Sequence, residues 1–142
     1  MKVLFVNGPN MNMLGIREPD IYGKRDYRAL CEYIEEFSGD SLYEIYQSNH
    51  EGDIVDKIQS VYGKVDGIVI NPAAYTHTSV AIADALSSVG IPYVEVHLSD
   101  VNNREDFRKI SFTRANAVCV VSGLGFAGYK KAFDILSEHR GK

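Results

Sequence analysis

The sequence predicts an α/β protein built on an open, five-stranded parallel sheet that carries helices on both faces. Three observations support this prediction. Short β-branched and aromatic runs alternate along the 142-residue chain with segments whose apolar residues recur at helical spacing. The run at 67–70 has no polar residue, as expected of a central parallel strand. The repeat lengths also suit right-handed crossovers, which favours helices on both sides of the sheet.

The expected elements follow one another without a domain boundary, so we predict one catalytic domain over residues 1–142. We expect strands at 3–6, 42–46, 67–70, 93–96 and 117–121. Helices are expected at 27–38, 51–62 and 80–88 and after Gly128, with Asp26 capping the first and Thr78 or Ser79 the third. The second helix should turn Tyr62 inward. Five such units favour the flavodoxin-like strand order 2-1-3-4-5.

A loop at about residues 8–24 carries the most chemically varied set of side chains in the sequence. The segment Asn7-Gly8-Pro9 ends the first strand, because Gly relaxes the backbone and Pro cannot continue a ladder. The loop is longer than most connections in compact domains, and it carries amides, cations and a phenol. We therefore expect an active-site lid at the carboxyl end of the first strand.

Composition excludes several classes of partner. The net charge of −4 argues against nucleic acid, which requires a clustered cationic surface. No apolar run approaches the roughly twenty residues that span a bilayer, and the N-terminus lacks a signal-peptide core. The two cysteines, Cys31 and Cys119, are expected to be buried, reduced thiols. These observations predict a cytoplasmic protein that binds neither nucleic acid nor membranes.

Polar residues just past three neighbouring strands are expected to face one crevice. In an open parallel sheet, ligands bind outside the carboxyl ends of the strands near the switch point. Asn10, Asn71 and His97 follow the first, third and fourth expected strands. His77 and Ser99 lie beside them in the same junctions. The topology therefore predicts a polar site assembled from segments far apart in sequence.

Each candidate also has a purely structural interpretation. A single histidine such as His97 is more often a hydrogen-bonded structural residue than a catalyst. Strand alternation, however, places Glu95 on the same face, where it can orient the imidazole for acid–base chemistry. Tyr22 is by default a packing aromatic, but the nearby Arg17 would favour its phenolate. Arg108 is either a solvated charge or a group that recognises a polar or anionic substrate.

Other chemistries fit the sequence less well. The pattern Gly123-x-Gly125-x-x-Gly128 follows the last strand with no βαβ unit after it, so we interpret it as a lead into the last helix rather than a dinucleotide site. The histidines lack close metal-ligand spacing, and no metal or cofactor is expected. Two alternatives to an enzyme remain: a non-catalytic ligand-binding module and a flavin electron carrier, of which a colourless preparation would exclude the second.

Four sequence blocks resemble the type II 3-dehydroquinate dehydratases. They are NGPNMNMLGIREPDIYG (7–23), QSNHEG (47–52), INPAAYTHTS (70–79) and VEVHLS (94–99). The resemblance continues through REDFR (104–108) and GLGFAGY (123–129), in the same order over essentially the whole chain. It implies a flavodoxin-like subunit of a homododecamer built of trimers. It also implies reversible dehydration of 3-dehydroquinate in the shikimate pathway, or quinate breakdown, without metal or cofactor.

The resemblance further implies a role for individual residues. Tyr22 matches the base that removes the C2 proton, Arg17 the group that keeps it ionised, and Asn10 the residue that positions a water at the enolate. His97, supported by Glu95, matches the acid that protonates the departing hydroxyl. The remaining matches are substrate-binding positions: Asn71, Leu98 and Ser99 for the carboxylate, His77 and Arg108 for the hydroxyls, and Asp84 reaching a neighbouring subunit. Ala83 stands where many members have Arg, which weakens the expected trimer contact around Asp84.

Overall fold

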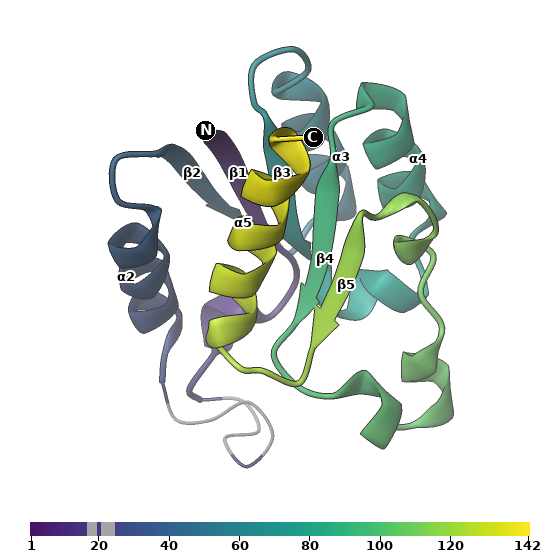
Figure 1. Ribbon diagram of the computed structural model, residues 1–142. Coiled ribbons are helices and arrows are strands. Elements are labelled where there is room, and N and C mark those ends of the chain that lie inside the picture. The colour runs from purple at the N-terminus through teal and green to yellow at the C-terminus, as the bar shows by residue number, and fades with distance from the viewer. Residues whose placement is uncertain (17–19, 21–24) are drawn as a thin grey trace.

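The computed structural model describes residues 1–16, 20 and 25–142 and contains a five-stranded parallel sheet (Figure 1). The order is β2-β1-β3-β4-β5, as the sequence predicts. The strands are β1 (Lys2–Asn7), β2 (Leu42–Gln47), β3 (Gly67–Asn71), β4 (Tyr93–His97) and β5 (Cys119–Ser122). The chain reverses direction across the sheet between β1 and β3, which creates the switch point at their carboxyl ends.

Helices cover both faces of this sheet (Figure 1). The α-helices are α2 (Tyr27–Ser38), α3 (Glu51–Ser60), α4 (Val80–Val89) and α5 (Ala127–Arg140). Short 3-10 turns are η1 (Met11–Met13), η2 (Ala73–His77), η3 (Val101–Asn103), η4 (Asp106–Lys109) and η5 (Arg114–Asn116). Apolar residues of α2 and α5 pack with one face of the sheet, and those of α3 and α4 pack with the other. The doubly wound fold class is therefore confirmed.

The expected helix caps are present. The Asp26 carboxylate accepts from the Ala29 N–H at 2.8 Å, and the Ser79 hydroxyl accepts from the Ile82 N–H at 2.9 Å. Each cap satisfies a backbone donor that the first helical turn leaves unpaired, and its removal typically costs about 1 kcal/mol. The choice between Thr78 and Ser79 is thereby resolved in favour of Ser79.

Several expected details differ from the structure. The helix α3 ends at Ser60, so Tyr62 lies beyond it and is 68% exposed instead of facing inward. The fifth strand begins at Cys119 rather than at 117, and two residues separate it from the η5 turn, which ends at Asn116. Cys31 and Cys119 are both free thiols, but they are only half-buried. Within the described residues, no helix is long and apolar enough to cross a membrane.

The close approach of two strand ends depends on Gly8. Its N–H donates to the Asn71 carbonyl at 2.8 Å, and a Cβ at this position would lie 2.4 Å from the Pro72 carbonyl oxygen. Only a residue without a side chain therefore fits here without moving the backbone of the β3–η2 junction.

Gly8→Ala is expected to lower the free energy of unfolding by about 1–3 kcal/mol, because the new methyl group overpacks rigid backbone. Urea denaturation measures the loss. Gly52→Ala is the matched control, since nothing lies within 4 Å of the point where its Cβ would be and a helical Ala should be neutral or stabilising. Equal stability of the Gly8 and Gly52 variants would contradict the steric argument.

Candidate active site

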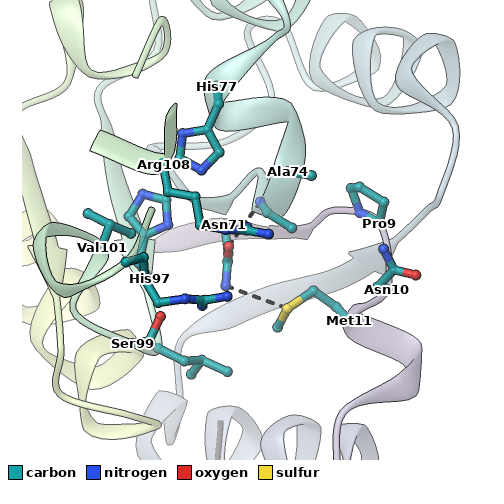
Figure 2. A pocket seen from close by; sticks show the side chains of 13 residues that line it. Pro9, Asn10, Met11, Asn71, Ala74, His77, His97, Ser99, Val101 and Arg108 are labelled. Carbon is teal, nitrogen blue, oxygen red and sulfur yellow. Dashed lines mark hydrogen bonds between the residues drawn. The ribbon is translucent and has the colours of Figure 1, made fainter. Parts of the chain in front are cut away.

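A crevice that is open to solvent lies at the carboxyl ends of β1, β3 and β4. Figure 2 shows His77, His97 and Arg108 on one side, Pro9, Asn10 and Met11 on the other, and Asn71 between them. The lining residues are Pro9, Asn10, Met11, Asn71, Ala73, Ala74, His77, His97, Leu98, Ser99, Val101, Arg104 and Arg108.

A buried acid–base pair lies at one wall of the crevice. Glu95 and His97 are two residues apart on β4, and strand alternation turns both to the same face. Glu95 is fully buried, and its Oε1 lies 2.6 Å from His97 Nε2. A carboxylate can only accept, so Nε2 donates this hydrogen bond and Nδ1 is the remaining ring nitrogen. The pair matches the arrangement expected from the sequence.

Glu95 is held ionised by hydroxyl groups from a distant segment. The Ser111 hydroxyl lies 3.1 Å from both carboxylate oxygens, and the Thr113 hydroxyl donates to Oε2 at 2.5 Å. Burial alone would raise the pKa of Glu95, but the hydrogen bonds from His97, Thr113 and Ser111 outweigh it and lower the pKa. The buried carboxylate therefore stays charged beside the imidazole. The Tyr93 hydroxyl bonds the Thr113 carbonyl at 2.5 Å and so anchors this segment.

His77 is a neutral imidazole with a defined tautomer. Its Nδ1 lies 2.5 Å from the Ile110 carbonyl, which can only accept, so Nδ1 carries the hydrogen and Nε2 is left as an acceptor. Burial lowers the pKa of His77 despite that hydrogen bond, with smaller contributions from His97 and Arg108. Arg108 also lines the crevice, and its Nε donates to Glu105 at 2.8 Å. The two side chains offer a hydrogen-bond acceptor and a cation to a ligand in the crevice.

Asn10 is held in a strained conformation by the segment after β2. Its φ of 68° is left-handed, which is uncommon for a residue with a Cβ, and such strain is typical of functional sites. Its N–H donates to Asn49 Oδ1 at 3.0 Å, and Gln47 Nε2 donates to the same oxygen at 3.1 Å. Gln47 also donates to the Gly8 carbonyl at 3.1 Å. The edge strand β2 thus positions the β1 wall of the crevice.

The floor of the crevice consists of Asn71, the last residue of β3, and the backbone after β4. Leu98 and Ser99 line it, and their carbonyls accept from the N–H groups of Gly125 at 3.0 Å and Gly123 at 3.2 Å. Both glycines have positive φ, a conformation that side chains disfavour. Gly123 and Gly125 precede α5, in keeping with a lead into the last helix, and they also fix these two peptide planes, whereas Gly128 already lies in the first turn of α5.

The structure brings together most of the predicted site. Asn10, Asn71, His77, His97, Leu98, Ser99 and Arg108 all line the crevice, with Glu95 directly behind His97. Asp84 does not line it, because it lies on the exposed side of α4. Tyr22 and Arg17 lie outside the described residues.

The sequence interpretation missed Ser111, Thr113, Gln47 and Asn49 as residues that support the site. For Gln47 and Asn49, the QSNHEG block was a signal that could have found them.

The crevice at the switch point of the sheet combines a carboxylate–imidazole pair with an array of neutral donors. These features are typical of an α/β enzyme that uses acid–base catalysis. Residues 1–16, 20 and 25–142 contain no cluster of three or more potential metal ligands.

The comparisons with known proteins name the enzyme family. The family described as dehydroquinase class II matches residues 1–137. A 3-dehydroquinate dehydratase of Clostridium acetobutylicum is 50% identical over 132 residues, which cover 91% of each chain. A catabolic 3-dehydroquinase 1 of Neosartorya fischeri is 52% identical, covering 93% of this chain and 89% of the relative. The crystal structure of the type II dehydroquinase from Butyrivibrio crossotus matches with a TM-score of 0.95 and 52% identity, covering 96% of this chain and 97% of that one.

The chain therefore belongs to the type II 3-dehydroquinate dehydratases, a family of hydro-lyases. The resemblance seen in the four sequence blocks is confirmed, and so is the assignment as an enzyme.

Proposed function

We propose that this enzyme converts 3-dehydroquinate reversibly into 3-dehydroshikimate by anti elimination through an enolate. A base takes the C2 proton, and the electrons of the C2–H bond form the enolate. When the ketone re-forms, a C=C bond forms next to it, and the hydroxyl leaves as water with a proton from an acid. The observation that carries this proposal is the buried Glu95–His97 pair in a crevice that also offers binding groups for a carboxylate and hydroxyls.

His97 is the proposed acid. Glu95 accepts a hydrogen bond from Nε2 at 2.6 Å, which fixes the orientation of the ring and places a carboxylate beside it. The opposite nitrogen, Nδ1, is then the one that delivers the proton to the departing hydroxyl. This is general acid catalysis, in which a positioned side chain donates a proton to the leaving group as its bond breaks.

Binding groups on the other walls hold the substrate. The Asn71 amide and the backbone N–H groups of Leu98 and Ser99 are proposed to receive the carboxylate. His77 Nε2 and the Arg108 guanidinium would then bind hydroxyls, one as acceptor and one as donor. Asn10 would position a water against the enolate oxygen, where preorganised donors stabilise charge that develops in the transition state.

Tyr22 is the proposed base, with Arg17 keeping it ionised. An ordinary phenol titrates near ~10, so a cation beside it is needed for a phenolate at neutral pH. Both residues are assigned from the family match of residues 7–23.

The test of the reaction is ultraviolet absorbance of the purified protein mixed with 3-dehydroquinate. Dehydration conjugates the ketone with a C=C bond, so product appears as a rising signal. Pretreatment with borohydride should leave the rate unchanged, because the proposed route forms no Schiff base. A folded protein without turnover, or one that borohydride inactivates, would contradict the proposal.

The Thr113 hydroxyl provides a test of the Glu95 charge. Thr113→Val removes one of the hydrogen bonds that lower the pKa of Glu95, so that pKa should rise. Activity that needs ionised Glu95 is lost as pH falls through this pKa, and the acid limb of kcat should therefore move to higher pH. Thr113→Ser keeps the hydroxyl and should keep the wild-type limb. A kcat–pH profile that is unchanged in the valine variant would contradict this role.

We further propose a homododecamer of trimers. Val80, Ile110 and Phe112 are 53%, 55% and 42% exposed, which leaves large apolar side chains available to an interface between subunits. Phe112 is tied to η2 beside the crevice by its N–H bond to the Thr76 carbonyl at 2.9 Å. Asp84 is exposed on α4 and is proposed to reach a neighbouring site. Sedimentation should give about 190 kDa for twelve chains of 15.8 kDa, and a stable monomer would contradict the proposal.

For the physiological role we propose the cytoplasmic shikimate pathway that leads to aromatic amino acids. Growth of a deletion strain without aromatic supplements would contradict a biosynthetic role.

A further inference from the structure

Three side chains from distant segments meet beneath the crevice. Asn7 and Asn71 are register partners at the last rung between β1 and β3. Alternation turns both toward the face that α5 covers, where Tyr129 is fully buried. The Tyr129 hydroxyl lies 2.6 Å from Asn7 Oδ1 and 3.2 Å from Asn71 Nδ2. One phenol therefore bridges two asparagine amides, of which only Asn71 lines the crevice.

The direction of each hydrogen bond in this group is fixed. The Ala73 N–H donates to Asn71 Oδ1 at 3.1 Å, which identifies the oxygen end of the Asn71 amide. Burial raises the pKa of Tyr129, so its hydroxyl keeps its hydrogen. It gives this hydrogen to Asn7 Oδ1 and can then only accept from Asn71. Asn7 in turn donates through Nδ2 to the Tyr27 hydroxyl at 3.4 Å, which is consistent with the same polarity.

One hydrogen of the Asn71 amide is left for a ligand. The second Nδ2 hydrogen is directed toward Met11 Sδ at 3.6 Å, as the dashed line in Figure 2 shows. A thioether is a weak acceptor, so an anionic oxygen in the crevice displaces it at little cost. The strong partners, Ala73 and Tyr129, keep their hydrogen bonds while this exchange occurs.

We propose that Tyr129 and Asn7 are positioning residues that determine which end of the Asn71 amide meets the substrate. They present an N–H rather than a C=O group, and thereby select a carboxylate at this subsite. The inference rests on the proposed function, in which Asn71 binds the substrate carboxylate. Without the phenol, the nitrogen end of the amide loses its buried acceptor, and the Ala73 N–H alone has to hold the orientation. A turned amide would set an oxygen against the anion.

The experiment is the steady-state kinetics of Tyr129→Phe with 3-dehydroquinate. A carboxylate contact is equal in ground and transition states, so KM should rise about tenfold while kcat changes about twofold at most. In an Asn71→Ala background, Tyr129→Phe should not raise KM further. Tyr33→Phe is the matched control, because it removes a phenol from the same helix layer, near Phe126, and should leave KM unchanged.

The outcomes separate this inference from the function on which it rests. An absence of turnover in the wild type would contradict the function. Normal wild-type turnover with an unchanged KM in Tyr129→Phe, or equal effects with and without Asn71, would overturn the positioning role.

Hydrogen exchange of the Asn71 side-chain amide, followed by NMR, tests the inference without turnover. One of its two hydrogens should be protected in the wild type and lose protection in Tyr129→Phe, and equal exchange in both proteins would overturn it. If Tyr129→Phe does not fold, the wild-type protein still provides a test. Rapid exchange of its Tyr129 hydroxyl proton with solvent would overturn the inference.

Discussion

His97→Ala is expected to lower kcat for dehydration by about 10²–10⁴-fold, the usual contribution of a positioned acid. The structure gives the reason. His97 is only 6% exposed, and its Nε2 is held by a fully buried carboxylate, so bulk water is poorly placed to replace it. The alanine variant should still exchange the C2 proton of the substrate with solvent, because removal of that proton precedes the step that needs the acid.

Two measurements check this prediction: ultraviolet absorbance for elimination, and NMR in D2O for deuterium at C2. Elimination should fall far more than exchange. Equal loss of both would argue against His97 as the acid and in favour of a role in binding or in the first step. His139→Ala, an exposed histidine in the last turn of α5, is the matched control and should behave like wild type.

Tyr22→Phe is expected to abolish turnover, with a loss of at least about 10²–10⁴-fold, while substrate binding survives. The change removes only the ionisable oxygen. The described residues that line the crevice include no carboxylate, lysine or tyrosine, and His77 has a lowered pKa that makes it a weak base. The C2 base is therefore sought in the expected lid at 8–24, where Tyr22 matches the family.

Calorimetric titration with the reaction product distinguishes loss of chemistry from loss of binding. Tyr62→Phe is a suitable control, because this tyrosine lies beyond the end of α3 and is 68% exposed. Near-normal turnover in Tyr22→Phe would remove the base assignment. If Tyr22→Phe keeps near-normal turnover and His77→Ala loses most of its kcat, His77 is the base instead.

Short-range patterns determined the fold and part of the site. Alternating strand and helix signals predicted the sheet order, and the period of two along β4 placed Glu95 and His97 on one face. Strand ends predicted that Asn71 and His97 would share a crevice with Asn10, because carboxyl ends of parallel strands meet at one edge. Asp26 and Ser79 were predictable as caps, since a cap depends on residues within one helical turn.

The partners that tune the site were decided only by tertiary structure. Thr113 reaches Glu95 across 18 positions, and Tyr129 reaches Asn7 across 122. No local pattern distinguishes these hydroxyls from ordinary surface or core groups, because their role depends on which helix packs over which strand end. The exposure of Tyr62 was missed for a related reason: the helical pattern continued, but the helix ended two residues earlier. Sequence alone determined the elements and the chemical groups, whereas tertiary packing decided which groups meet and in which orientation, because hydrogen bonds require contact within about 3 Å.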